Sequence, residues 1–163
     1  MRVKQLIFLF VLVMAMSIAT SVQATTNHKI GDTAKDFSLK TLSGKKVSLS
    51  QLRQQGHVLL MFWGAECVYC YGHIEGLNAL HEKYHGKGLT VAAINIAGEY
   101  NPEIAEYVKD NNLKYLVLSD RLNNLDVAEA LHVIGYPTLI LISPEGKILS
   151  RGNDIPDVTK WLK

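Results

Sequence analysis

Cysteine is scarce in this chain: its 163 residues include only two, Cys67 and Cys70, separated by two residues. A structural disulfide usually closes a longer loop, so this pair is not typical of a fold held together by cross-links. Tetrahedral zinc sites need four ligands, and the sequence has no second cysteine pair to complete one. The two thiols are therefore better explained as a reactive pair than as a structural cross-link or a zinc site.

The chain also lacks internal repeats, low-complexity tracts and linkers, and its length suits one domain with a real core. Neither sign of charge is in excess. Removing residues 1–24 removes Arg2 and Lys4 and no acidic residue, so 17 basic residues fall to 15 and equal the 15 acidic ones. This balance argues against a nucleic acid or an anionic membrane as the partner.

The first two dozen residues form a separate segment. Arg2 and Lys4 give a basic start, Leu6–Ala19 is an almost unbroken apolar run, and Val22-Gln23-Ala24 has the spacing that a signal peptidase reads. We therefore interpret residues 1–24 as a signal peptide and residues 25–163 as the exported, periplasmic domain. The alternative is an uncleaved signal that tethers the protein to a membrane, although the run is short for a bilayer span. No cysteine lies near Ala24, so a lipid anchor is not expected.

The stretch from Val58 to Cys70 is the centre of the prediction. Val58–Trp63 is rich in β-branched, aromatic and long aliphatic residues and predicts a buried strand. After Cys70 the apolar residues fall at helical spacing, which predicts a helix that begins near Cys67. A cysteine in the first helical turn faces unpaired N–H groups and the positive end of the helix dipole, which favour the thiolate. The second cysteine, one turn on, can attack a mixed disulfide formed at the first, so this is a dithiol redox site.

Strands and helices alternate over the rest of the chain and end in a hairpin, which predicts an α/β domain with a mixed sheet. Turn signals at Ser43-Gly44 and at Pro144–Lys147 predict the two hairpins. The predicted strands are 37–40, 46–49, 57–63, 90–97, 115–118, 138–142 and 148–151, and the predicted helices are 50–54, 67–85, 101–110, 124–131 and 157–163.

Several motifs, in this order along the chain, resemble those of the TlpA-like exported thiol–disulfide oxidoreductases of the thioredoxin-fold superfamily. The match covers about residues 30–163. The motifs are Gly31-Asp32-x-Ala34-x-Asp36-Phe37-Ser38-Leu39, Phe62-Trp63-Gly64 before Cys67-x-x-Cys70, Gly88-x-x-Val91-x-x-x-Asn95, Gly135-Tyr136-Pro137-Thr138 and Pro144-Glu145-Gly146-Lys147.

The resemblance implies a thioredoxin-like fold: a mixed central sheet flanked by helices, with an N-terminal hairpin extension and a central helical insert that includes Asn101–Asp110. It implies that Cys67 is the nucleophile and that Pro137 is a cis-proline facing the disulfide. Tyr136, Pro137 and an edge of Trp63 are the expected substrate contacts, since the backbone beside a cis-proline can bond an extended substrate. The implied function is reduction of disulfides in exported proteins, with no cofactor or metal and with re-reduction by a membrane electron donor.

The chain departs from the family pattern where a buried acid is usual. Met61 stands where thioredoxins carry aspartate, and His73 stands where TlpA-like chains often carry glutamate. Three side chains remain as candidates for proton transfer: His73, Glu66 and Glu99. A negative charge at Glu66, beside Cys67, should oppose formation of the thiolate.

Three alternatives use the same two sulfurs. Val68-Tyr69 resembles the residues between the cysteines of exported disulfide isomerases, so isomerase is the first. A copper metallochaperone is the second, because soft sulfur, with His73 or His132, suits Cu(I). A peroxidase of the peroxiredoxin type is the third, but the spacing here does not resemble the loop that carries its reactive cysteine.

Overall fold

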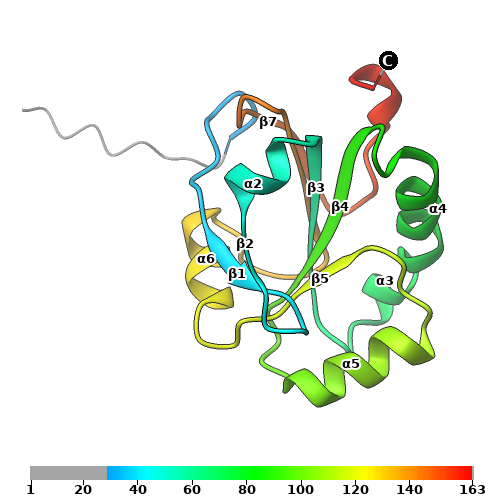
Figure 1. Ribbon diagram of the computed structural model, residues 1–163. Coiled ribbons are helices and arrows are strands. Elements are labelled where there is room, and N and C mark those ends of the chain that lie inside the picture. The colour runs from blue at the N-terminus through cyan, green and yellow to red at the C-terminus, as the bar shows by residue number, and fades with distance from the viewer. Residues whose placement is uncertain (1–28, 163) are drawn as a thin grey trace, which may run out of the picture.

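The computed structural model describes residues 29–162, and the predicted signal peptide lies outside them. A five-stranded mixed sheet has the order β5-β4-β3-β6-β7, and β1 and β2 form a separate antiparallel hairpin (Figure 1). The strands are β1 (Ser38–Lys40), β2 (Lys46–Ser48), β3 (Gly56–Trp63), β4 (Gly88–Asn95), β5 (Leu116–Leu118), β6 (Thr138–Ile142) and β7 (Ile148–Gly152). The helices are α2 (Leu49–Arg53), α3 (Val68–Tyr71), α4 (Ile74–Tyr84), α5 (Asn101–Asp110), α6 (Asn124–Ala130) and the 3₁₀ turn η1 (Val158–Lys160). The predicted α/β architecture is therefore confirmed.

Strand β3 lies in the middle of the sheet and is buried along most of its length. It pairs in parallel with β4 from Gly56↔Gly88 to Trp63↔Asn95. The pair starts at two glycines with positive φ, and a Cβ on Gly56 would lie 2.3 Å from the carbonyl oxygen of Gly88. Only a residue without a side chain permits this close approach of the two backbones.

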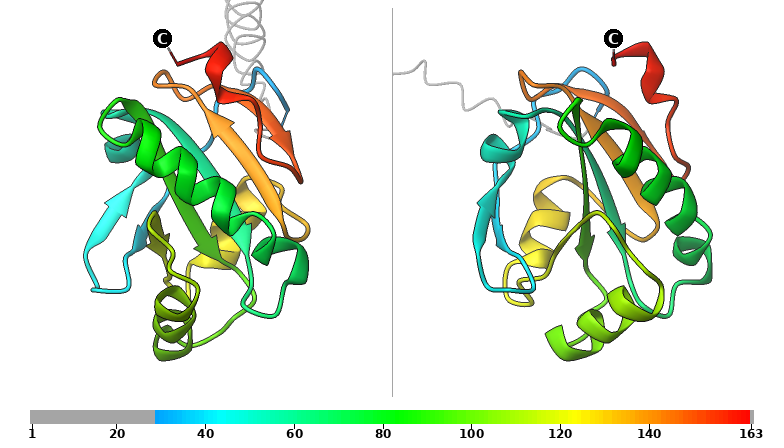
Figure 2. Two further views of the ribbon diagram at one scale, coloured as in Figure 1. Left: turned by 90° about the vertical axis from the view of Figure 1, so that its right-hand side faces the viewer. Right: turned by 45° about the vertical axis from the view of Figure 1, so that its right-hand side comes forward.

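Side chains of β3 alternate between the two faces of the sheet, as a pleated strand requires. One face packs beneath α2 and α6 through Val58, Leu60 and Phe62. The other face packs beneath α4 through Leu59, Met61 and Trp63. Figure 2 shows α4 and α6 on opposite sides of the sheet. β3 is therefore packed on both faces, and the turn that follows it leaves from the buried end of the strand.

One end of the sheet gathers the loops that carry chemistry. Strands β3, β4 and β5 are parallel, so their carboxyl ends share one edge, and β6 is antiparallel to β3, so it begins there. Helices α3 and α5 lie at this end in Figure 1. The segment after β3 contains Cys67 and Cys70, and the segment before β6 contains Pro137. This topology brings together residues about seventy positions apart.

The predicted helix from Cys67 to His85 is wrong in one respect, because it is two helices. Gly72 closes α3 and His73 begins α4, so the cysteines lie on a four-residue helix separate from the longer one. Sequence periodicity misses this break because the apolar positions of both helices face the same core.

Smaller corrections concern helix ends and one strand. Ser48, rather than Ser50, caps α2, and its side chain accepts the N–H of Gln51. Strand β4 starts and ends two residues earlier than predicted, since it pairs with β3 from Gly88 onward. The predicted C-terminal helix is only a 3₁₀ turn capped by Asp157. None of the helices in residues 29–162 combines the length and apolarity that crossing a bilayer demands.

Candidate active site

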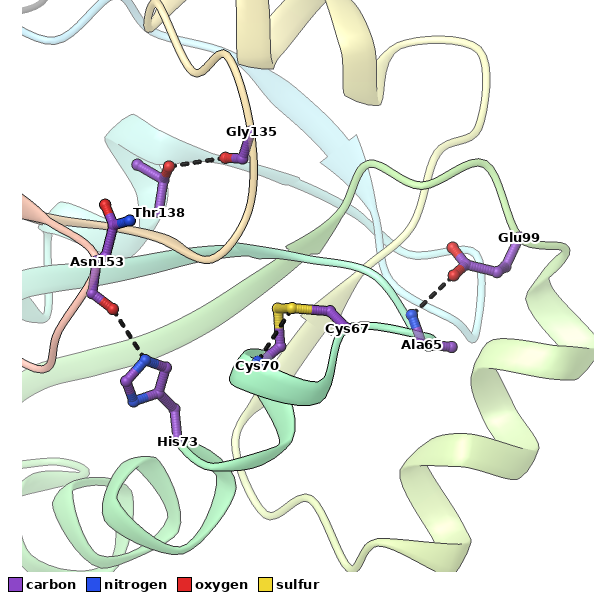
Figure 3. The surroundings of a disulfide bond; sticks show 8 residues. All are labelled: Ala65, Cys67, Cys70, His73, Glu99, Gly135, Thr138 and Asn153. Carbon is purple, nitrogen blue, oxygen red and sulfur yellow. Dashed lines mark hydrogen bonds between the residues drawn. A yellow bond between two sulfur atoms is a disulfide. The ribbon is translucent and has the colours of Figure 1, made fainter.

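Cys67 and Cys70 are joined by a disulfide, with an S–S distance of 2.04 Å and a Cα–Cα distance of 5.1 Å (Figure 3). Cys67 is the N-cap of α3, and its Sγ accepts the backbone N–H of Cys70 at 3.0 Å. Cys67 is half-buried, whereas Cys70 is only 2% exposed. The first sulfur therefore faces outward and the second lies within the core, which is the asymmetry that an attacking and a resolving cysteine need.

The loop before β6 lies close to the disulfide. The Tyr136–Pro137 peptide bond is cis, as the resemblance implies, and Pro137 is buried while Tyr136 is 44% exposed. The hydroxyl of Thr138 donates to the carbonyl of Gly135 at 2.7 Å, which closes the loop around the proline. Figure 3 shows this hydrogen bond in the surroundings of the disulfide.

Gly64 allows this loop to approach the cysteine turn. A Cβ at Gly64 would lie 2.6 Å from the Cβ of Ala97 and 3.2 Å from the ring of Tyr136. Three segments therefore meet at one glycine: the turn after β3, the loop after β4 and the cis-proline loop. In the sequence Gly64 is only one residue of a motif, because nothing local reveals which residues pack against it.

Glu99 is the acidic side chain that the structure connects to the cysteine turn. Its Oε1 accepts the backbone N–H of Ala65 at 2.7 Å, across 34 residues of sequence (Figure 3). The other carboxylate oxygen is buried and has no hydrogen-bond partner. The half-buried carboxylate of Glu99 is therefore held at Ala65, two residues before Cys67 in the sequence. One of its oxygens has no hydrogen-bond partner. Glu66, by contrast, is exposed and adjoins Cys67 only through the chain.

His73 is turned away from the disulfide. Its Nε2 lies 2.8 Å from the carbonyl oxygen of Asn153, and Figure 3 shows the ring directed toward that residue. A carbonyl only accepts, so Nε2 carries the hydrogen in this contact, and Nδ1 is the ring nitrogen that can accept a proton. The ring ties the start of α4 to the segment after β7, and the role of His73 in proton transfer stays a prediction.

Trp63 is 3% exposed and therefore mostly core, and the contact of its edge with substrate stays a prediction. Its ring lies 5.0 Å from that of Tyr107, centroid to centroid, and it belongs to the core cluster that contains Cys70 and that Cys67 packs against. Burial, and more weakly Tyr71, raise the pKa of Tyr107; burial, followed by Tyr107, raises that of Tyr115. Trp63 and Tyr115 belong to the same core cluster as Cys70, and Tyr107 packs against it.

Within the described part of the chain, no group of three or more His, Cys, Asp or Glu side chains is arranged to hold a metal ion. His132, a suggested copper ligand, lies after α6 and borders a surface cavity with Ile134 and Tyr136.

The sequence of this chain matches a known protein family. The AhpC/TSA family model matches residues 30–151. The chain belongs to this family. Thiol-disulfide oxidoreductase ResA of Bacillus thuringiensis subsp. konkukian is 33% identical over 121 residues, which are 74% of this chain and 68% of that protein.

Solved structures that are similar to this chain have the same fold. A thiol-disulfide oxidoreductase from Bacteroides fragilis is 26% identical with a TM-score of 0.68, and the match covers 78% of this chain and 94% of that one. A protein of Chlorobium tepidum assigned as thiol:disulfide interchange protein DsbE is 27% identical with a TM-score of 0.70. That match covers 82% of this chain and 92% of that one. The resemblance to thiol–disulfide oxidoreductases is therefore confirmed.

Proposed function

We propose that this protein is an exported thiol–disulfide oxidoreductase that reduces disulfides in other exported proteins. The observation that carries the proposal is the Cys67–Cys70 disulfide, with an outward first sulfur and a buried second sulfur, beside the cis-proline loop. The names of the relatives support the same reaction class. The disulfide in the structure is the oxidised form of the proposed reductant.

The reaction transfers two electrons from the dithiol to a substrate disulfide. Cys67 thiolate attacks one substrate sulfur, the substrate S–S bond breaks, and the leaving sulfur departs as a thiolate that takes up a proton. Cys70 then loses its proton and attacks Cys67 Sγ, which forms the internal disulfide and releases the second substrate thiolate. An external electron donor must then reduce Cys67–Cys70, and we propose that it is a membrane protein.

The N–H of Cys70 supports the attacking group. It donates to Cys67 Sγ at 3.0 Å in the disulfide, and the same donor can stabilise a Cys67 thiolate after reduction. The exposed carboxylate of Glu66 acts in the opposite direction, because a nearby negative charge disfavours a second one. A less stabilised thiolate makes the dithiol a better electron donor.

We therefore propose a reductant with a potential nearer to about −270 mV than to about −120 mV. Equilibration with glutathione buffers measures it. A potential near the oxidant end, with Cys67 thiolate persisting well into acid, would mean that the protein makes disulfides. An isomerase would instead rearrange a substrate with scrambled disulfides without net reduction, which distinguishes that alternative.

Trapping tests the chemistry directly. In Cys70→Ala the resolving sulfur is absent, so substrates should remain attached to Cys67 through a mixed disulfide that a thiol reagent releases. Cys67→Ala is the matched control and should trap nothing, because Cys70 is buried. Equal trapping by both variants would contradict the proposal.

A further inference from the structure

Two histidines lie one turn apart at the C-terminal end of α4. The segment His81-Glu82-Lys83-Tyr84-His85 separates them by four positions. The backbone N–H of His85 donates to the carbonyl of His81 at 2.8 Å, so a closed helical turn fixes their spacing. The two rings are 4.6 Å apart, centroid to centroid, with 32° between their planes. Both imidazoles therefore lie on the same side of α4.

The ring nitrogens of this pair are available as ligands. Nδ1 of His81 is buried and has no hydrogen-bond partner, so Nε2 is the nitrogen through which that ring would bind a metal ion. His85 is exposed, so its ring is open to solvent. A neutral imidazole nitrogen is the commonest metal ligand in proteins. Because the helical turn already holds the two rings together, binding does not have to order them.

The spacing His-Glu-x-x-His is also that of helical zinc sites in metalloproteases, where the glutamate is the general base. Here Glu82 forms an ion pair with Lys114, which precedes β5. Residues 29–162 also contain no group of three His, Cys, Asp or Glu side chains arranged around one ion. The pair therefore fits a two-imidazole chelate, with the remaining positions of the ion left to water, rather than a hydrolytic centre.

The two nitrogen ligands indicate which ions fit. Imidazole suits copper, nickel and zinc, whereas magnesium and calcium prefer oxygen. For one set of ligands, affinity among the divalent ions of the first transition row rises to Cu²⁺ and falls again at Zn²⁺. Cu²⁺ also accepts a square arrangement of nitrogen and oxygen ligands, which two imidazoles and water can supply.

We propose that His81 and His85 form a surface site for a divalent transition-metal ion, with Cu²⁺ bound most tightly. Helix α4 begins at His73, beside α3, and runs away from α3 in Figure 1, so the site lies at the other end of α4 from the cysteines. It uses none of the sulfur ligands of the metallochaperone alternative. The inference is independent of the proposed function and adds a binding site to it.

Cu²⁺ titration of the untagged protein in its disulfide form tests the inference, because Cys67 and Cys70 are then not available as thiolate ligands. Wild-type protein should bind an ion whose electron paramagnetic resonance spectrum shows two imidazole nitrogens. His85→Gln and His81→Gln should each weaken this binding at least tenfold, because a single imidazole loses the advantage of intramolecular chelation. His85 is exposed, so its variant tests the site without disturbing the core.

Two controls separate this site from other histidines. His132→Gln removes a histidine that follows α6 and should leave the affinity unchanged. The double variant Lys83→His with His85→Gln keeps the number of histidines but places them two positions apart, where they do not face each other, so binding should stay weak. Full affinity in His85→Gln, or its recovery in the double variant, would overturn the inference. Loss of binding in His132→Gln alone would also overturn it, and none of these results bears on disulfide exchange.

Discussion

Glu99 and Ala65 are joined by a hydrogen bond of 2.7 Å that links the loop after β4 to the turn carrying Cys67. The acceptor is a carboxylate and the donor is a backbone N–H, so the bond is of the stronger, charge-assisted kind. Met61 and His73 stand where chains of the similar family usually carry acids. Glu99 is the acidic side chain that the structure connects to this turn. We propose that it positions the turn and sets the charge near Cys67.

Glu99→Gln should separate these two roles. The amide keeps an oxygen that can accept the N–H of Ala65 but removes the negative charge, so the pKa of the Cys67 thiol should fall. Glu99→Ala removes both and should also lower the free energy of unfolding by about 1–3 kcal/mol, because the part-buried N–H loses its partner. Alkylation rate against pH, in a Cys70→Ala background, measures the thiol. An unchanged profile in both variants would show that Glu99 has no effect on Cys67.

The two cysteines should differ in reactivity. Cys67 is half-buried at the cap of α3 and Cys70 is almost fully buried, so a Cys70→Ser protein should be alkylated much faster at pH 7 than a Cys67→Ser protein. We expect at least a tenfold ratio. Faster modification of Cys70 would reverse the assigned roles of attacking and resolving group.

Gly64→Ala should weaken the active site by overpacking. The added Cβ would lie 2.6 Å from the Cβ of Ala97, so the turn or the loop must move, at a cost of about 1–3 kcal/mol in the free energy of unfolding. Exchange with a substrate disulfide should slow because the cysteine turn and the Tyr136 loop separate. Gly152→Ala is the control, since a Cβ there meets nothing within 4 Å. Equal effects of the two substitutions on unfolding would argue against close packing at Gly64.

His73→Ala should act on stability rather than on proton transfer. It removes the bond from the ring to the Asn153 carbonyl, at a cost of about 0.5–1.5 kcal/mol in the free energy of unfolding. The pH profile of the step in which Cys70 resolves the mixed disulfide should remain unchanged. Stopped-flow measurement of that step decides, and a lost or shifted ionisation would restore the proton-transfer role.

His81 should make the protein less stable in mild acid. Burial, followed by neighbouring His85, lowers the pKa of His81 from its ordinary value of 6.5, and Glu82 opposes this more weakly. The unfolded chain therefore binds a proton at a higher pH than the folded one. The stability that neutral His81 contributes is fully present above pH 6.5. It is lost progressively as the pH falls through the lower pKa that His81 has in the folded chain.

Urea unfolding between pH 8 and pH 5 measures this dependence, and His81→Gln should make it flatter. His85→Gln, which removes the second cause of the low pKa, should flatten it partly. A pH dependence identical in wild-type protein and His81→Gln would mean that His81 titrates alike in the folded and unfolded chains.

Local pattern was sufficient for most of the fold. The apolar run of β3, the glycines and prolines that end elements and the helical spacing after Cys70 predicted nearly every strand and helix. Backbone preference and side-chain periodicity act over a few residues, so one sequence can reveal them. The break at Gly72 and His73 escaped notice because neither residue disturbs the apolar spacing.

The sequence by itself determined the chemistry, since two cysteines with two residues between them, after a buried strand, allow dithiol exchange wherever they fold. Only the tertiary structure decided what surrounds those sulfurs. It paired Glu99 with Ala65 across 34 residues and His73 with Asn153 across 80, and it buried Trp63. These relationships depend on the register of β3 with β4 and β6, which is set by packing on both faces of the sheet. No local preference encodes such a contact, because its free energy exists only when the whole sheet has formed.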